Sequence, residues 1–510
     1  MKSTARSVWF RRGGIMCART LAILALLGCS LASMGQSPAP TVRTGRAIPL
    51  LESPATVQKA KASPAADELQ LVVALFRHGV RAPLDGFTNA AANAHSRDEW
   101  PLLKDWNVVS GGTWGDLTQH GYLLATALGR FYGDRYKPNW QTGFNVFLWA
   151  DVDKRTRDTA AGLRDGFIKA GVENVKVDYL QGSDTDPLFH PFKAKCGTPN
   201  AVELKAIADD ITNSWRSWVL GLHIEFDQFY KVLNLSGQTS SQLPLNQVKD
   251  HATAWSDKEE RGSSPIRWSG QESYGGRPPY AGQFPYASSA TEAFVLEYAN
   301  RMSPVAWNRL PTATMTSILS LHEFYFEKTE RNKYLARVEG SNLIREIRGI
   351  VNRNIGGCRH IPIDVQFAGL VGHDTNLANV GSRLNLTWHF ADAPDDITKG
   401  LPANNALPAG ALLFELWKRG DESVVTIWYS AQGLQRMREC TTDDCPGFVI
   451  PVQNPACQGL PNRCEIPLAE FNKLLSDAID PNFLSACVNG QQICPKPPTA
   501  RKRKKKGENQ

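Results

Sequence analysis

The chain has 510 residues, of which 42% are hydrophobic and 21% charged, values that are ordinary for a globular protein. Its formal net charge of +7 is concentrated at the two ends, in the basic residues before position 36 and in the RKRKKK run near the C-terminus. The sequence between them is mildly acidic, which argues against a nucleic-acid-binding protein.

Residues 1–35 have the organisation of an export signal: a basic stretch to Arg19, the apolar run TLAILALLGCSLA, and then small residues. The apolar run is too short to span a bilayer as a stable helix, so no transmembrane segment is expected. The LLGC sequence ending at Cys29 also resembles a bacterial lipoprotein cleavage box, in which Cys29 would carry a lipid anchor. Simple cleavage after Ala32 or Gly35 is the alternative. The expected location is periplasmic or secreted, or the outer membrane if Cys29 is lipidated.

Three short apolar runs follow a Pro-, Ala- and Ser-rich segment at residues 36–66, which is expected to be a flexible linker. They are LVVALF, FNVFLWA and VQFAGLV, at residues 71–76, 144–150 and 365–371. Each is rich in β-branched or aromatic residues and lacks a helical stripe, which predicts strands buried on both faces. Residues 117–136 have apolar residues at helical spacing, with Thr118 as the expected N-cap. Strand, helix and strand in this order predict an α/β core.

The middle of the chain has a different pattern. Residues 201–236, 289–302 and 311–350 favour helices, and the Gly-, Ser-, Pro- and Tyr-rich segment at residues 263–286 is expected to be a long loop. We interpret this region as a helical domain inserted into one α/β domain. The expected boundaries are residues 67–190 and 356–490 for the discontinuous α/β domain, 191–355 for the helical cap domain and 495–510 for a disordered basic tail.

Of the ten cysteines, eight lie beyond the signal region, and an even number in an exported chain favours disulfides. No Cys-x2-Cys pair is present and no paired histidines occur at helical spacing, so we expect no metal site. The simplest bridges join near neighbours, Cys440 to Cys445 and Cys457 to Cys464. The sequence leaves the partners of Cys358 and Cys494 open.

Polar side chains follow each of the three predicted strands. They are Arg77, His78 and Arg81 after the first strand, Arg155 after the second, and His373 and Asp374 after the third. Because ligands of open α/β sheets bind at the carboxyl ends of the strands, we expect these side chains to converge. Arginines donate paired hydrogen bonds to oxyanions, so such a group is suited to a phosphoryl group.

His78 has the surroundings of a nucleophile, because nearby cations keep an imidazole neutral at low pH. A neutral ring nitrogen can attack phosphorus and form a phosphohistidine. Asp374 could then protonate the leaving alkoxide and activate the water that hydrolyses the intermediate. Each motif alone has a structural alternative, such as a salt-bridged helix start or a hydrogen-bonded turn. Three of them, each following a buried strand, favour a functional site.

The segments RHGVRAP (77–83) and GHDTN (372–376) resemble the signature pair of the histidine acid phosphatases, most closely the bacterial periplasmic phytases and glucose-1-phosphatases. The resemblance covers residues 68–490 and extends through GDLT, ADVDKRTRDT, DPLFHP, TEAF, LSLHEFYF and LLFELW. It implies a central mixed, largely parallel sheet flanked by helices, with a phosphoglycerate-mutase-like core and an inserted helical cap domain. It also implies chemistry without a cofactor or metal.

The resemblance further assigns roles to matching residues. It implies His78 as the nucleophile and Asp374 as the proton donor. The phosphate ligands that it implies are Arg77, Arg81, Arg155 and His373. It also implies a disulfide between Cys196 and Cys487.

The sequence departs from the phytase pattern at two positions where phytate (myo-inositol hexakisphosphate) is held. Asp85 stands where those phytases have a lysine, and Glu339 where they have an arginine. Both changes place an acid where a polyphosphate favours a base, which should weaken phytate binding. Because HDTNLAN is nevertheless closer to phytases, phytate and sugar phosphates both stay open as substrates. The remaining candidates for contacts with the leaving group are Glu292, Arg337 and Thr375.

The leading hypothesis is therefore an exported acid phosphatase that hydrolyses phosphomonoesters through phosphohistidine. A phosphoglycerate-mutase-like phosphotransferase shares the Arg-His-Gly sequence, but export, disulfides and the Asp374 donor argue against it. A non-catalytic phospholigand-binding module requires a lost nucleophile or acid, yet His78 and Asp374 are both present. The expected partner is a small phosphomonoester, and the sequence does not indicate an oligomeric state.

Overall fold

The computed structural model describes most of the chain from residue 67 onward. The described residues are 67–84, 100–140, 143–197, single positions and short runs between 202 and 218, 221–233, 267–268, 280–281, 283–353, 361–458, 462–488 and 491–494, all within the unit Ala62–Gln510. The predicted signal, linker and basic tail lie outside them, as do Asp85 and Cys358. None of the helices in these ranges is long and apolar enough to cross a membrane.

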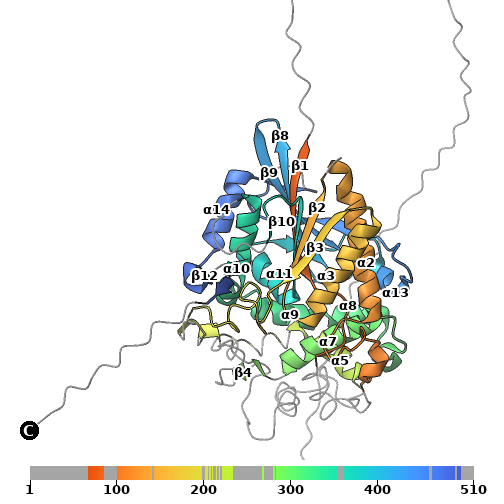
Figure 1. Cartoon of the computed structure of the whole chain (residues 1–510). Coiled ribbons are helices and arrows are strands. Elements are labelled where there is room, and N and C mark those ends of the chain that lie inside the picture. Colours follow the sequence, from red (N-terminus) through yellow and green to blue (C-terminus); the bar gives the residue numbers. More distant parts are fainter. Residues whose placement is uncertain are drawn as a thin grey trace, which may run out of the picture. The chain divides into compact units, whose positions relative to one another are not determined.

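A nine-stranded mixed sheet forms the centre of the fold (Figure 1). Its order is β3 (Asn174–Tyr179), β2 (Asn145–Ala150), β6 (Phe367–Gly372), β1 (Glu68–Arg77), β8 (Ala411–Arg419), β9 (Glu422–Ala431), β10 (Phe448–Gln453) and β7 (Thr387–Trp388), with β11 (Cys464–Pro467) also paired to β9. The four strands from β3 to β1 run parallel, and the pairs from β1–β8 onward are antiparallel. The predicted mixed sheet with parallel core strands is confirmed.

The strand β1 is buried on both faces, as its apolar run predicted. Leu71, Val73 and Leu75 belong to one core cluster, whereas the alternating Val72 and Phe76 belong to another. This alternation follows from the two-residue period of a strand, which directs successive side chains to opposite faces of the sheet. Both faces are therefore covered by other elements, and β1 is a rigid support for the residues that follow it.

Helices α2 (Gln119–Tyr136) and α3 (Lys154–Lys169) lie together on one face of the sheet (Figure 1). The predicted N-cap is confirmed, since the Thr118 hydroxyl accepts a hydrogen bond from the Gly121 amide at 2.9 Å. The two helices approach closely because glycines face the contact. A Cβ added at Gly129 would lie 2.1 Å from the Leu163 carbonyl oxygen, so a larger residue there would separate α2 from α3.

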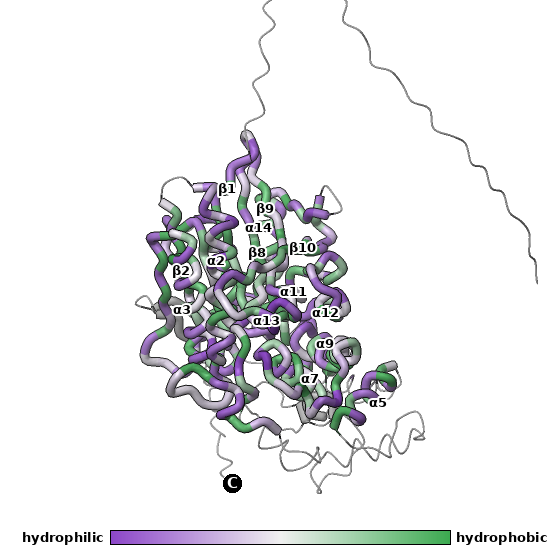
Figure 2. The backbone as a smooth tube through the Cα atoms, turned by 90° about the vertical axis from the view of Figure 1, so that its right-hand side faces the viewer, coloured by the Kyte–Doolittle hydropathy of each residue, from purple (hydrophilic) through white to green (hydrophobic). Residues whose placement is uncertain are grey.

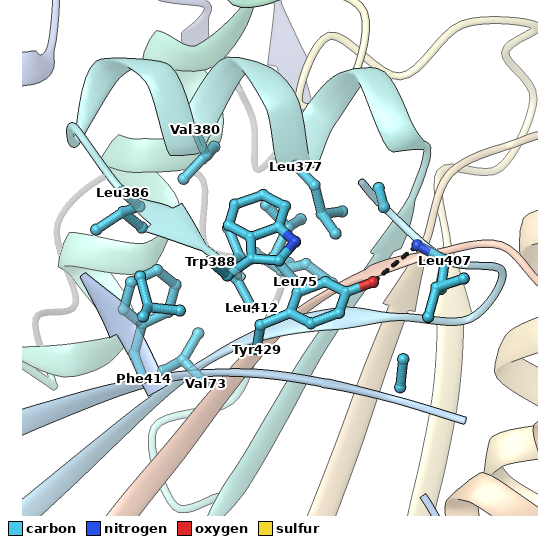
Figure 3. Close-up of a cluster of buried hydrophobic side chains, with 14 of the residues drawn as sticks. Val73, Leu75, Leu377, Val380, Leu386, Trp388, Leu407, Leu412, Phe414 and Tyr429 are labelled. Atoms are coloured by element: carbon cyan, nitrogen blue, oxygen red, sulfur yellow. Dashed lines mark hydrogen bonds between the residues drawn. The ribbon is translucent and has the colours of Figure 1, made fainter. Parts of the chain in front are cut away.

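The opposite face is covered by α10 (Lys333–Val351), α11 (Asp374–Arg383) and α14 (Leu468–Ala478). Beneath α11, the rings of Trp388 and Tyr429 stack at 5.0 Å between centroids (Figure 3). The Tyr429 hydroxyl accepts a hydrogen bond from the Leu407 amide at 2.7 Å, so this buried phenol is satisfied. Figure 2 shows hydrophobic and hydrophilic segments alternating along the helices, as expected where one side faces the core.

Between β3 and β6 the described residues are mainly helical, in agreement with the predicted pattern. The helices there include α5 (His223–Val232), α7 (Gln283–Ala299), α8 (Thr312–Ile318), α9 (Ser320–Lys328) and α10. They share a separate core cluster that contains Phe226, Phe229 and Phe294. The expectation of a loop over 263–286 was wrong in part, because β4 (Arg267–Trp268) pairs with β5 (Tyr280–Ala281) and α7 already begins at Gln283. The local Gly and Pro content predicted a loop, and it could not indicate this pairing between distant residues.

The two short-range disulfides are confirmed, Cys440 with Cys445 and Cys457 with Cys464. The expected Cys196–Cys487 bridge was wrong, because Cys196 is bonded to Cys494 with the two Cα atoms 4.6 Å apart. The strands β12 (Ala486–Val488) and β13 (Gln491–Ile493) form a hairpin that carries the chain through Cys487 to Cys494. Because Cys487 and Cys494 are close in sequence, the path of this hairpin must be known before either can be assigned as the partner of Cys196.

A buried carboxyl in α7 should make the stability of the protein depend on pH. Burial raises the pKa of Glu297 to about 7, although a hydrogen bond from the Ala306 amide at 2.8 Å favours the ionised form. The folded protein then binds an extra proton between the unfolded pKa near 4.5 and about pH 7, so stability falls as the pH rises through this window. We expect this group to cost on the order of 3 kcal/mol between pH 4.5 and 7.

Replacing the acid with the neutral Glu297→Gln should remove this dependence, because the amide oxygen can still accept from Ala306. The measurement is denaturant unfolding of both proteins at pH 5 and pH 7.5. An equal loss of stability in the variant and the natural protein over this range would contradict the prediction.

Candidate active site

The carboxyl ends of β1, β2 and β6 meet at one edge of the sheet. The His78 amide donates to the Gly372 carbonyl at 2.9 Å, and the Asp151 amide donates to the Val371 carbonyl at 3.0 Å. These bonds continue the parallel ladders by one residue beyond the strands. The polar segments that follow the three strands are thereby brought together, as their positions in the sequence led us to expect.

His78 is held in a single orientation, with its side chain almost completely buried. Its Nδ1 lies 2.9 Å from the Gly79 carbonyl oxygen, which can only accept, so Nδ1 carries the proton. The unprotonated Nε2 faces Arg81, whose Nε lies 3.4 Å away. Burial, followed by the charges of Arg155 and the other site arginines, lowers the pKa of His78 well below its usual value. The ring is therefore neutral even in acid and keeps a lone pair on Nε2.

Glu292 of α7 joins two of the site arginines. Its carboxylate is paired with Arg77 and lies 3.2 Å from Arg81 Nη2. Arg77 also donates to the Ala406 carbonyl and lies 3.1 Å from Asp374 Oδ2. Glu292 thereby holds the guanidinium groups of Arg77 and Arg81 through charge-assisted contacts.

Arg155 and His373 form the other side of the site. Arg155 Nη2 lies 3.3 Å from His373 Nδ1 and 2.5 Å from the Asp153 carboxylate. His373 Nε2 donates to the completely buried Asp151 carboxylate at 2.7 Å. Burial opposes ionisation of Asp151, but hydrogen bonds from His190 and His373 hold its pKa well below the usual range.

Asp374 is the first residue of α11, and its Oδ1 accepts from the Thr375 amide at 2.8 Å. Burial would raise its pKa, but the charges of Arg77, His322, Arg81 and His373 outweigh this and lower it. Asp374 is therefore ionised, although Glu292 also pairs with Arg77 and Arg81. A bound phosphate would add negative charge beside these cations, which changes this balance.

A pocket of about 340 Å³ opens at this edge, and we call it the strand-end pocket. Its lining residues are His78, Arg81, Leu84, Asp153, Arg155, Phe189, His190, Lys193, Glu339, His373, Asp374, Thr375 and Asn379. Thr375 and Glu339 thus face the pocket as expected. Arg337 does not line it, because its guanidinium pairs with Asp480 at 3.3 Å and stacks over Tyr334.

Asp151, His190 and Lys193 had no role predicted from the sequence. The segment DPLFHP was noted only as part of a resemblance, yet it brings His190 within 2.9 Å of Asp151. This segment is anchored by Asp186, which accepts from the Trp149 indole at 2.9 Å and from the Leu188 amide at 2.8 Å. This segment lies beside β2, and the spacing of motifs along the chain could not predict that contact.

Four side chains in this region also make a donor set that suits a metal ion. Ligand atoms of Asp151, Asp153, His190 and His373 lie within 4.8 Å of one another. However, the Arg155 guanidinium already pairs with Asp153 and contacts His373, and the Asp151 carboxylate accepts from both imidazoles. These contacts supply the positive charge that the carboxylates require, so we assign the cluster to a hydrogen-bonded network and not to a metal.

The profile of the histidine phosphatase superfamily (branch 2) matches residues 68–430. The chain belongs to this family. Among curated proteins, it is 28% identical to phytase AppA of Escherichia coli over 81% of this chain and 92% of that protein. It is 23% identical to glucose-1-phosphatase of Salmonella typhimurium over 82% of this chain and 95% of that protein. Both relatives are phosphoric monoester hydrolases, and this histidine phosphatase is one as well.

The fold of this histidine phosphatase is also similar to that of solved bacterial phytases. The Hafnia alvei phytase in complex with myo-inositol hexakis sulphate is 27% identical, with a TM-score of 0.67 over 82% of this chain and 99% of that one.

Proposed function

We propose that this histidine phosphatase hydrolyses phosphomonoesters through a phosphohistidine at His78, with phytate among its substrates. The observation that carries the proposal is the unprotonated Nε2 of His78, which faces the strand-end pocket beside Arg81 and near the Asp374 carboxylate. In this proposal Arg77, Arg81, Arg155 and His373 hold the phosphoryl oxygens. The arginines offset the charge that develops on these oxygens as His78 attacks.

The proton for the leaving group comes from Asp374. A phosphate dianion among the arginines offsets the cations that lower the pKa of this carboxyl and places a like charge beside it. Substrate binding therefore raises the pKa of Asp374 and favours its protonated form. After the alcohol departs, the same carboxylate can accept a proton from the water that attacks the phosphohistidine.

Phytate as a substrate is supported by the kinship with phytases and by a pocket wider than one phosphate. Glu339 weighs against tight binding of a polyphosphate, because its carboxylate lines the same pocket. We therefore expect phytate to be hydrolysed with a lower specificity constant than it would have with a basic residue at this position. Asp85, the other acid at a phytate position, lies outside the described residues.

The experiment is a comparison of kcat/KM for phytate, glucose 1-phosphate and p-nitrophenyl phosphate near pH 5. The Glu339→Arg change should raise the phytate value relative to the p-nitrophenyl phosphate value by about tenfold, because an attractive charge replaces a repulsive one. The matched Glu439→Arg change, on an exposed turn of α13 (Leu434–Glu439), alters net charge equally and should leave the ratio unchanged.

No hydrolysis of any of the three esters by the natural protein would refute the phosphatase proposal. Hydrolysis of the other two esters without phytate would refute phytate alone. An unchanged ratio in Glu339→Arg would show that Glu339 does not face the leaving group.

The proposal also includes export, on the evidence of the N-terminal sequence, to the periplasm or the medium. It retains the division into a discontinuous α/β domain and an inserted helical cap domain, supported by the separate core of the helices between β3 and β6. The strand-end pocket takes lining residues from both, with His78 and His373 from the sheet side and Glu339 from α10.

A further inference from the structure

One buried carboxylate serves two histidines at the edge of the strand-end pocket. Asp151 Oδ2 accepts from His373 Nε2 at 2.7 Å and from His190 Nε2 at 2.9 Å, and the two rings lie 4.8 Å apart. Asp151 is fully buried, and its backbone is held by β6. Because a carboxylate only accepts, both imidazoles use an Nε2–H for these bonds.

The remaining ring nitrogen of His373 faces the phosphate side of the pocket. His373 Nδ1 lies 3.3 Å from Arg155 Nη2, so in the neutral ring it accepts from this arginine. To donate to a phosphate oxygen instead, Nδ1 must gain a proton, and His373 becomes an imidazolium. Asp151 stabilises that cation only if its single negative charge is not already shared with a protonated His190.

We propose that His190 is a positioning residue that competes with His373 for Asp151 and thereby sets the pH above which His373 no longer donates to phosphate. The inference rests on the proposed function, because it takes His373 as a phosphate ligand. His190 itself takes no part in the proposed catalytic steps.

The charges around His190 come from several elements. The facing groups are Asp151 after β2, Asp153 and Arg155 at the start of α3, Glu339 on α10, His373 before α11, and Lys193 on the segment of His190 itself. Burial lowers the pKa of His190, but the bond to Asp151 and the acids Glu339 and Asp153 raise it overall. Burial, Arg155 and His190 lower the pKa of His373 against the pull of Asp151. As the pH falls, His190 therefore gains its proton first and delays that of His373.

The test compares the natural protein with His190→Gln, whose side-chain amide can donate to Asp151 but carries no charge. The probe is inorganic phosphate, with its dissociation constant measured by calorimetry from pH 4 to pH 8. We expect the pH at which phosphate affinity declines to rise by roughly one unit in the variant, the size expected for two partly screened charges near 5 Å apart. His190→Asn is a second uncharged variant if His190→Gln does not fold.

Lys176→Asn is the matched control, because it removes an exposed cation of β3 that does not line the strand-end pocket. Its decline in phosphate affinity should stay within a few tenths of a pH unit of the natural protein. Histidine NMR titrations should show the pKa of His373 raised in His190→Gln and unchanged in Lys176→Asn, and they do not depend on turnover.

A decline at the same or lower pH in His190→Gln would overturn the inference. In that case continued hydrolysis of p-nitrophenyl phosphate would leave the proposed function intact. Loss of both phosphate binding and hydrolysis in the natural protein would instead refute the proposed function.

Discussion

Replacing His78 with alanine should reduce kcat for p-nitrophenyl phosphate by on the order of 10⁴-fold or more, because it removes the neutral imidazole nitrogen that attacks phosphorus. The natural protein, quenched with alkali during turnover of radiolabelled substrate, should retain label on His78. The variant should retain none. Inorganic phosphate should still bind to the variant, since Arg77 and Arg81 keep their ion pairs with Glu292 when the imidazole is removed.

The matched control is His120→Ala, which removes a histidine from α2 that contacts the Met437 carbonyl and does not line the strand-end pocket. It should keep the natural kcat within a few-fold. Substantial hydrolysis by His78→Ala, or label on another residue, would show that the reaction does not pass through His78.

Replacing Asp374 with asparagine should separate substrates by their leaving groups. An alkoxide from phytate or glucose 1-phosphate requires a proton as it departs, so kcat should fall by about 10²- to 10⁴-fold. The p-nitrophenolate ion leaves without one, and its release should slow far less. Label should then accumulate on His78 with p-nitrophenyl phosphate, because the variant also lacks the base that activates water.

Asp395→Asn is a matched control, since Asp395 caps α12 (Asp396–Lys399) and its replacement retains the capping oxygen. It should affect neither class of substrate. Equal losses for aryl and alkyl phosphates in Asp374→Asn would indicate that this carboxylate orients Arg77 and is not the proton donor.

The fold was predictable where local pattern and burial agree. The runs that became β1, β2 and β6 are mostly apolar because helices cover both faces of the sheet, and Thr118 precedes α2 because its hydroxyl satisfies a free amide. The β4–β5 pair was missed, because strand pairing depends on a partner that no local pattern reveals. The bridge from Cys196 to Cys494 was missed for the same reason.

The site residues that could be predicted from the sequence are those that follow the ends of strands. His78, Arg155 and His373 each lie within five residues of the end of a buried run, so the order of elements was enough to bring them together. Arg337 shows the limit of this prediction, because its place two residues before Glu339 on α10 directs it to Asp480 and not into the pocket. A helix turns 100° per residue, so residues two apart lie on different faces.

By itself, the sequence determined the chemistry available to this protein: a histidine, arginines and a carboxylate placed after strands that must be buried. Only the tertiary structure decided how these groups share charge. Asp151 lies between His190 and His373, and Glu292 lies between Arg77 and Arg81, through contacts that span up to 222 positions of the chain. Protonation depends on distance and burial, and both are set by packing between segments that are remote in sequence.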